Sequence, residues 1–509
     1  MVRTGSVYTV DAVAEWLWME TVMSEGTGVM KLRVGQQLKV TASQLAPSGA
    51  GVVTEHVPSP LHVRNLLPSE EAMVVVQHVS RHGGPAHAVI QRRNSCAMDR
   101  VIPSCSSFGP CGGCAVLHLS YEAQLAWKSR MVRDELAPLF MAVNPCVAAP
   151  SPWDYRTRVK LVATSHPQRK LMLGAFAPRS HHVLDIAGCQ TNRRTLMAVA
   201  KTVAEQAAAL GVTPYDEATA EGSLRYLLLR EVDSGAVQVS LVMADRPAQL
   251  SALVDAVVRQ HPCVQSIVLH HNASRGNALL PAGSASGGPA GAQAGLEDDQ
   301  ELGSADGDQV LVGESFLWED MEVRLRVSAR SFLQVNRQVA RLIYRDVAML
   351  LAHVEPDTIL DLYCGVSGLG RTVLAEHPQA RLIGIELGPS AIADAQASAQ
   401  SAGLPPERAR FYVGKVEEVL PQLDLSSPTA KGRLVALINP PRRGCTEAAL
   451  QALHAVSPSH IIYMSCSPSS LLRDLIWLHE HGYATQQVTP YDMHPGTPHI
   501  ECVALLQRQ

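Results

Sequence analysis

One cysteine in this 509-residue chain follows a run of apolar residues that is typical of a buried strand. The run Ile461–Met464 leads into Ser-Cys-Ser-Pro, in which the cysteine is Cys466. Loops at the carboxyl ends of strands hold ligands in open α/β sheets, so Cys466 could be a covalent nucleophile. The alternative is a buried core thiol, because free cysteine is among the most buried residue types. Two motifs nearby in the chain, Asn439-Pro440-Pro441-Arg442 and His499-Ile500-Glu501, favour the nucleophile.

Three further cysteines, Cys105, Cys111 and Cys114, lie in a loop rich in glycine and have the spacing C-x5-C-x2-C. Small residues let a backbone wrap tightly around a metal centre, and Cys189 is a candidate fourth ligand. Four thiolates suit either an iron–sulfur cluster or a closed zinc site. The spacing counts against the radical S-adenosylmethionine enzymes, which need C-x3-C-x2-C.

A second motif predicts a nucleoside site. The apolar strand 358–362 runs into the glycine-rich sequence 363–370 and then into a helix, and glycine permits close approach of the backbone to a ligand. The next strand ends at Glu386, whose carboxylate could accept hydrogen bonds from two ribose hydroxyls. We therefore expect a doubly wound α/β domain. A dinucleotide site is disfavoured, because the glycines do not fit G-x-G-x-x-G.

Composition narrows the class of protein. With 46% hydrophobic and 18% charged residues and no apolar run of membrane-spanning length, we expect a cytoplasmic, monomeric protein without a membrane partner. The formal charge of −4 means that any nucleic-acid surface must be local. Eleven cysteines without a secretory leader argue against a disulfide framework and for metal-binding or catalytic thiols.

The pattern of the sequence divides the chain into four parts. Residues 1–30 are expected to be an extension, and Met30 could be the true start. Residues 31–93 alternate in short runs broken by Gly and Pro, as in a small β-barrel. Residues 94–330 hold the cysteine loop and a mixed α+β central domain, with a flexible Gly/Ala/Ser-rich insertion at 272–309. Residues 331–509 form the α/β domain.

Basic residues alternate in one predicted strand of the central domain. A strand would place Arg156, Arg158 and Lys160 on one face. Three cations in a row could contact phosphates, although a solvated strand face has the same pattern.

Together these motifs resemble those of the bacterial class I RNA 5-methyluridine methyltransferases, of the type that acts on 23S ribosomal RNA. The segment Leu45–Val52 is similar to the TRAM domain, an oligonucleotide-binding-type barrel, and the cysteine triplet resembles the iron–sulfur cluster loop of the family. Residues 465–468 match Ser-Cys-Asn-Pro with Ser467 in place of Asn. Residues 331–336 and 491–501 match the Phe-x-Gln-Val-Asn and terminal His-x-Glu motifs.

The resemblance implies methylation of a uridine at C5 in RNA, with S-adenosylmethionine as the donor and 23S ribosomal RNA as the expected partner. Because C5 of uracil is a poor nucleophile, the Cys466 thiolate would first add at C6. After methyl transfer, Glu501 would act as the general base that removes the C5 proton. The resemblance further implies donor contacts from Gln334, Tyr363, Glu386 and Asn439, and a [4Fe–4S] cluster, or alternatively zinc, on Cys105, Cys111, Cys114 and Cys189.

Departures from the family pattern fall on the expected donor pocket. Ser367 stands where the family has glycine, Lys415 replaces Asn or Asp, and Asn439 replaces Asp, which keeps an acceptor oxygen but loses the charge. A catalytically weakened RNA-binding homologue is therefore an alternative, as is a transfer-RNA uridine-5 methyltransferase. An amino-group methyltransferase is disfavoured, because Arg442 rather than an aromatic residue follows the two prolines.

Overall fold

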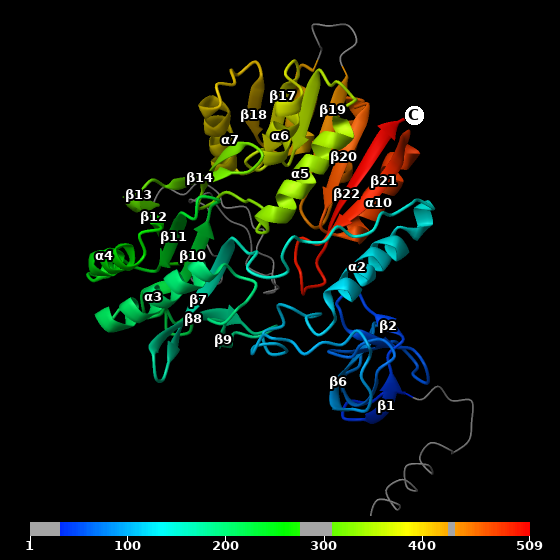
Figure 1. Ribbon diagram of the computed structural model, residues 1–509, viewed down its shortest axis with the longest axis vertical. Helices are drawn as coiled ribbons and strands as arrows, with labels where there is room; N and C mark the ends of the chain where they lie inside the picture. The colour runs from blue at the N-terminus through cyan, green and yellow to red at the C-terminus, as the bar shows by residue number, and fades with distance from the viewer. Residues whose placement is uncertain (1–30, 275–307, 426–432) are drawn as a thin grey trace, which may run out of the picture. The chain divides into compact units, whose positions relative to one another are not determined.

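The structure is a computed structural model that describes residues 31–274, 308–425 and 433–509 (Figure 1). The predicted extension 1–30 and positions 275–307 of the predicted insertion lie outside the described residues. The described residues form two compact units, one within positions 31–46 and 50–98 and one within positions 47–49 and 99–509. In the described parts of the chain, no helix has both the length and the apolar character needed to cross a bilayer.

The first unit is β-rich. Its strands are β1 (Gln37–Thr41), β2 (Gln44–Leu45), β3 (Gly51–Val53), β4 (Leu61–Val63), β5 (Glu71–His78) and β6 (Ala86–Arg93). They form one six-stranded sheet in the order β1-β5-β6-β4-β3-β2. In β5 the alternate residues Ala72, Val74 and Val76 are fully buried, because successive side chains of a strand point to opposite faces.

The central part of the second unit is a seven-stranded sheet in the order β13-β12-β11-β10-β7-β8-β9. The core residues of α3 and α4 pack in one cluster with those of the sheet, so both helices cover the same face. Strands β12 and β13 are antiparallel neighbours, so the chain leaves and re-enters this sheet at adjacent strands on either side of positions 275–307. The elements are β7 (Arg158–His166), β8 (Lys170–Phe176), β9 (Val183–Asp185), α3 (Arg194–Leu210), β10 (Leu224–Glu231), β11 (Val237–Met243), α4 (Leu250–Gln260), β12 (Val264–His271) and β13 (Gln309–Gly313).

The C-terminal part is an α/β domain. Its elements are α5 (Arg337–Leu351), β16 (Thr358–Leu362), α6 (Gly368–Glu376), β17 (Arg381–Glu386), α7 (Pro389–Ser401), β18 (Ala409–Val413), α8 (Val416–Val419), β19 (Leu434–Ile438), α9 (Glu447–Ala455), β20 (His460–Ser465), α10 (Pro468–Glu480), β21 (Tyr483–Tyr491) and β22 (Glu501–Arg508). The strand order is β18-β17-β16-β19-β20-β22-β21. All neighbours are parallel from β18 to β20, and β22 is antiparallel to both β20 and β21.

This sheet is covered by helices on both faces. Ile359 packs into the core shared with α5, α6 and α7, whereas its neighbour Leu360 packs into the core shared with α9 and α10. The strands are therefore apolar on both sides, as expected for a buried parallel sheet. The predicted doubly wound, Rossmann-like fold is confirmed.

Two segments that precede residue 331 contribute to the α/β core. The first is helix α2 (Tyr121–Glu135), whose Val132 packs in the same cluster as Leu471 of α10. The second is the hairpin of β14 (Phe316–Asp320) and β15 (Arg324–Ser328), whose Leu325 packs in the same cluster as Val339. The division of the chain at residues 93 and 330 stays a prediction.

Candidate active site

The order of the parallel strands reverses between β16 and β19, and a crevice for a ligand forms at such a point in open α/β sheets. Leu362 and Ile438 are partners in the last rung between the two strands, and the Asn439 backbone N–H donates to the Leu362 carbonyl at 3.2 Å. Tyr363 and Asn439 therefore leave the sheet side by side. Glu386 ends the adjoining strand β17.

The turn between β16 and α6, residues 363–367, is called the donor turn below. Tyr363, Gly365 and Ser367 all have left-handed backbone conformations, with φ values of 59°, 53° and 57°. The Glu386 carboxylate accepts the N–H of Gly365 at 3.0 Å and that of Gly388 at 2.9 Å, one on each oxygen. A carboxylate oxygen can accept more than one hydrogen bond, so both oxygens keep capacity for a ribose hydroxyl.

The other two predicted donor residues border this turn. Burial raises the pKa of the Tyr363 hydroxyl, as does its hydrogen bond with Cys445, so the ring points toward the α9–α10 core. Gln334 is half-buried in the segment between β15 and α5. A Cβ atom added at Gly365 would lie 3.9 Å from the carbonyl oxygen of Phe332, so this segment passes close to the donor turn.

Cys466 lies between the end of β20 and the start of α10, and its side chain is half-buried. The next residue, Ser467, caps α10 by accepting the Ser470 N–H on its hydroxyl at 3.4 Å. The cysteine thus stands at the amino end of a 13-residue helix, where the helix dipole favours an anion such as a thiolate.

The register of β20 and β22 brings Glu501 to the same place. Ser465 pairs with Cys502 and Met464 with Val503, so Cys466 directly follows one member of the last pair in this antiparallel ladder and Glu501 directly precedes the other. Glu501 is also buried, with 4% of its surface exposed. The two residues predicted to act as nucleophile and base therefore both lie at the carboxyl end of β20.

The loop that precedes Glu501 is anchored by two residues that sequence reasoning missed. Lys128 of α2 has no exposed side-chain surface and contacts Asp492 at 2.5 Å, and it also donates to the His494 carbonyl at 3.2 Å. Asn336 caps α5 through the Val339 N–H and donates from Nδ2 to the Met493 carbonyl at 3.1 Å. An Asn before a helix is a recognisable capping signal. The Lys128–Asp492 pair joins positions 364 residues apart and has no such signal.

Cations surround two histidines of this loop. Desolvation lowers the pKa of His499 to about 4, and Arg442, Lys128 and Arg156 act in the same direction. The same causes lower the pKa of His494, whose ring centroid is 5.9 Å from that of His499. Both imidazoles are therefore neutral at neutral pH.

The basic run of the central domain supplies Arg156 of this group. Burial alternates along the run, with Arg156, Arg158 and Lys160 partly exposed and the residues between them buried. Arg158 lies opposite Arg230 of β10.

Helix α10 also fixes the turn that follows Asn439. Asp474 is buried and accepts the Cys445 N–H at 2.8 Å. Arg473 donates to the carbonyls of Arg443 and Cys445 at 2.9 and 3.0 Å. The segment after β19 is therefore held in place by the helix that begins beside Cys466.

The four cysteines of the predicted metal centre lie near one another. Burial raises the pKa of Cys114 to about 12, and Cys189, Cys111 and Cys105 each contribute in the same direction. The pKa of Cys111 is raised by the same causes. In the part of the chain that the structure describes, no three His, Cys, Asp or Glu side chains are placed as ligands of one metal ion. The thiols share a neighbourhood, and their donor chemistry suits iron or zinc, but their sulfur atoms do not converge on one point.

The three departures from the family pattern have different surroundings. The Lys415 ammonium pairs with Glu418 at 2.8 Å on an exposed surface. Asn439 stands at the crevice and is partly exposed. Ser367 is buried, and its hydroxyl donates to the Asp361 carboxylate at 2.6 Å.

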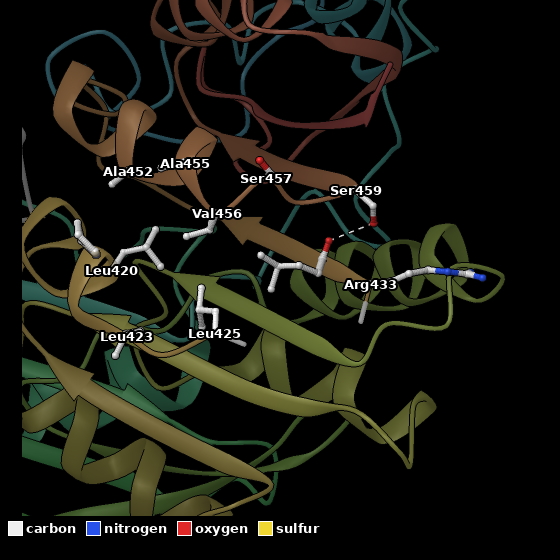
Figure 2. A pocket seen from close by; sticks show the side chains of 11 residues that line it. Leu420, Leu423, Leu425, Arg433, Ala452, Ala455, Val456, Ser457 and Ser459 are labelled. Atoms are coloured by element: carbon white, nitrogen blue, oxygen red, sulfur yellow. Dashed lines mark hydrogen bonds between the residues drawn. The ribbon is translucent and has the colours of Figure 1, made fainter. Parts of the chain in front are cut away.

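A cavity of about 500 Å³ lies elsewhere in the domain, where β19 and β20 begin (Figure 2). Its lining includes Leu420, Leu434, Val456 and Ser459. The residues predicted to do chemistry follow the opposite, carboxyl ends of these strands, so the cavity is separate from the candidate active site.

Comparisons with known proteins place these observations in context. A family model described as tRNA (Uracil-5-)-methyltransferase matches residues 422–509. An uncharacterized RNA methyltransferase of Halalkalibacterium halodurans is 30% identical over 92% of this chain and 96% of its own length. One from Geobacter sulfurreducens is 30% identical over 96% of this chain and 93% of its own.

A solved structure shares the fold. The tRNA (uracil-54, C5)-methyltransferase of Pyrococcus abyssi, determined in complex with S-adenosyl-L-homocysteine, has a TM-score of 0.69 and 23% identity. The match covers 92% of this chain and 100% of that one.

Proposed function

The chain belongs to the S-adenosylmethionine-dependent RNA (uracil-5-)methyltransferases, and from this we propose that it methylates C5 of a uridine in 23S ribosomal RNA through a covalent intermediate on Cys466. The observation that supports the proposal is the pairing of Ser465 with Cys502, which brings the neighbouring residues Cys466 and Glu501 to the same end of β20. A nucleophile and a base at the same end of neighbouring strands can both reach one pyrimidine ring.

Each step of the proposed reaction assigns a role to one side chain. The Cys466 thiolate adds to C6 of uracil, and the electron pair of the C5–C6 bond moves to C5 and O4 as an enolate. C5 then takes the methyl group from the donor sulfonium, and S-adenosylhomocysteine leaves. Glu501 removes the remaining C5 proton, the C5–C6 double bond re-forms, and the thiolate departs. The target base has to leave its stack to reach this site.

The donor would bind at the crevice beside β16. Glu386 would accept the ribose hydroxyls, and Gln334, Tyr363 and Asn439 would contact the rest of the molecule. The position of Tyr363, Glu386 and Asn439 at the ends of three neighbouring strands supports this assignment. A catalytically weakened homologue remains the competing hypothesis, because Asn439 lacks the charge of the aspartate it replaces. Calorimetric titration with S-adenosylhomocysteine separates the two, since absent or millimolar affinity would favour the weakened protein.

Cys105, Cys111, Cys114 and Cys189 would hold a [4Fe–4S] cluster, which would supply structural cross-linking of the loop and no step of the reaction. The mutual electrostatic influence of these thiols supports the assignment. Zinc is the second reading, because four thiolates also suit Zn²⁺. Iron and acid-labile sulfide analysis after anaerobic purification distinguishes the two.

Transfer RNA is a second candidate substrate. The matching family model and the Pyrococcus abyssi enzyme are both named as tRNA methyltransferases. The cysteine loop and the β-rich first unit favour ribosomal RNA, as the resemblance to the 23S-specific type implies. Mapping 5-methyluridine in total RNA from cells with and without the gene decides between them.

The covalent step has a direct test. RNA that contains 5-fluorouridine should form a stable adduct with the wild-type protein, because fluorine at C5 cannot leave as a cation. The Cys466→Ala variant should form none, whereas Cys263→Ala, which removes a partly buried thiol of the central domain, should react normally. An adduct that persists in Cys466→Ala would assign the chemistry to another thiol.

A further inference from the structure

Ser367 occupies a backbone position that favours glycine. Its φ and ψ of 57° and 39° are left-handed, a conformation that L-residues with a Cβ atom rarely adopt. The side chain is nevertheless completely buried. A strained serine persists in a buried turn when its side chain makes an interaction that glycine could not make.

That interaction is a hydrogen bond to a buried carboxylate. The Ser367 hydroxyl donates to Oδ2 of Asp361 at 2.6 Å, and Asp361 itself is 3% exposed. The N–H of Gly370 in the first turn of α6 donates to the same carboxylate. A Cβ atom added at Gly370 would lie 2.3 Å from Asp361 Oδ2, so only glycine permits this approach. Asp361 thus ties two points of the chain that leads from the donor turn into α6.

The opposite side of the donor turn is held by Glu386. The Gly365 N–H donates to one oxygen of this carboxylate, and the Gly388 N–H donates to the other. Gly365 is two residues before Ser367, so the hydrogen bonds to Glu386 and to Asp361 hold the same short turn at two points.

We propose that Ser367 is a positioning residue for the methyl donor: its hydrogen bond to Asp361 holds the donor turn so that Glu386 presents its oxygens to the ribose of S-adenosylmethionine. The inference rests on the donor site proposed above. The replacement of glycine by serine suggested a weakened donor pocket. In this proposal the serine instead stabilises the conformation of the pocket. Ser367 makes no contact with the uracil ring in this scheme, so its effect falls on donor binding.

The test measures the binding of S-adenosylhomocysteine to the full-length protein by calorimetry, together with kcat and the donor KM. Ser367→Ala keeps the strained backbone and loses the hydrogen bond, so we expect affinity to fall about fivefold, the factor that one ordinary hydrogen bond contributes. Ser367→Gly loses the bond but relieves the strain, and a smaller loss is expected. In both variants the donor KM should rise while kcat at saturating donor stays within about twofold of wild type.

Thr372→Val is the matched control, because it removes a buried hydroxyl of the same helix that bonds to the Gly368 carbonyl and not to Asp361. It should bind the donor product as the wild type does. If Ser367→Ala does not fold, Ser367→Gly, which the backbone accommodates, carries the test. Wild-type affinity in both serine variants, or a loss confined to kcat, overturns the positioning role.

A Glu386→Ala variant separates this inference from the donor site itself. Loss of affinity in Glu386→Ala with wild-type affinity in the Ser367 variants overturns only the role of Ser367. Unchanged affinity in Glu386→Ala overturns the donor site on which the inference rests. The Ser367→Ala substitution can also be introduced into an Asp361→Asn protein. If it weakens binding there by the same factor as in the wild type, the role of Ser367 is contradicted, because the two residues should act as one unit.

Discussion

Replacing Glu501 by glutamine should trap the enzyme on its RNA. The substitution keeps the size of a buried side chain and removes the carboxylate that lies with Cys466 at the carboxyl end of β20. Addition at C6 and methyl transfer do not use this group, so both should proceed. Removal of the C5 proton should slow by about 10²–10⁴-fold, the usual contribution of a general base.

The consequence can be expressed as a lifetime. For a typical turnover of about 10 s⁻¹, that slowing extends the lifetime of the methylated adduct to roughly 10–1,000 s. An adduct of this lifetime survives quenching in denaturant. On a denaturing gel, Glu501→Gln mixed with unmodified substrate RNA and S-adenosylmethionine should show a protein–RNA band of higher mass.

The Cys466→Ala/Glu501→Gln double variant is the control, and it should show no such band. Mass spectrometry of the nuclease-treated band should find a nucleotide that already carries the methyl group. Rapid, normal turnover of Glu501→Gln would refute the reasoning, because it would mean that the register of β20 and β22 does not bring the working base to Cys466.

Three further predictions concern stability and metal content. Lys128→Met should lower the free energy of unfolding by about 3–5 kcal/mol in urea titrations, because it leaves Asp492 as an unpaired buried charge; a loss below about 1 kcal/mol would contradict this account. Burial raises the pKa of Asp361 to about 7, above its unfolded value of about 3.9, so its contribution to stability is full at low pH and is lost as the pH rises through 7. Asp361→Asn should therefore lose less thermal stability than the wild type between pH 5 and 8, and parallel Tm–pH curves would argue against a raised pKa. Cys111→Ser should lose bound iron and the brown colour of anaerobically purified protein, whereas Cys263→Ser should keep both; equal iron in the two would exclude Cys111 as a ligand.

Local pattern in the sequence was enough for the α/β domain. Three features of the sequence each mark the end of a strand to within a few residues. They are the apolar run before Cys466, the glycine-rich turn after residue 362 and the carboxylate at Glu386. Parallel strands place their carboxyl ends at one edge of a sheet, so these separate signals predicted a common crevice. The structure confirms the predicted fold, while the roles of the individual residues stay predictions.

The sequence could not predict which hydrophobic core each helix packs into. Helix α2 follows the cysteine loop in the chain, yet Val132 packs in the core of the α/β domain. An amphipathic helix shows which of its faces is apolar but not which distant surface covers that face. The ion pair of Lys128 with Asp492 follows from that packing, and no spacing of residues in the sequence predicts it.

The sequence by itself determined which chemical groups this protein has available: a thiol after a strand, a carboxylate near the C-terminus, a nucleoside-type turn and a set of four cysteines. Only the tertiary structure decided that Cys466 and Glu501 lie at the same end of β20, because the antiparallel insertion of β22 beside β20 pairs Ser465 with Cys502. Only the tertiary structure showed that the Ser367 side chain meets a buried carboxylate, since the backbone of the turn directs it inward. Residue types follow from the gene, whereas the distances between them follow from packing.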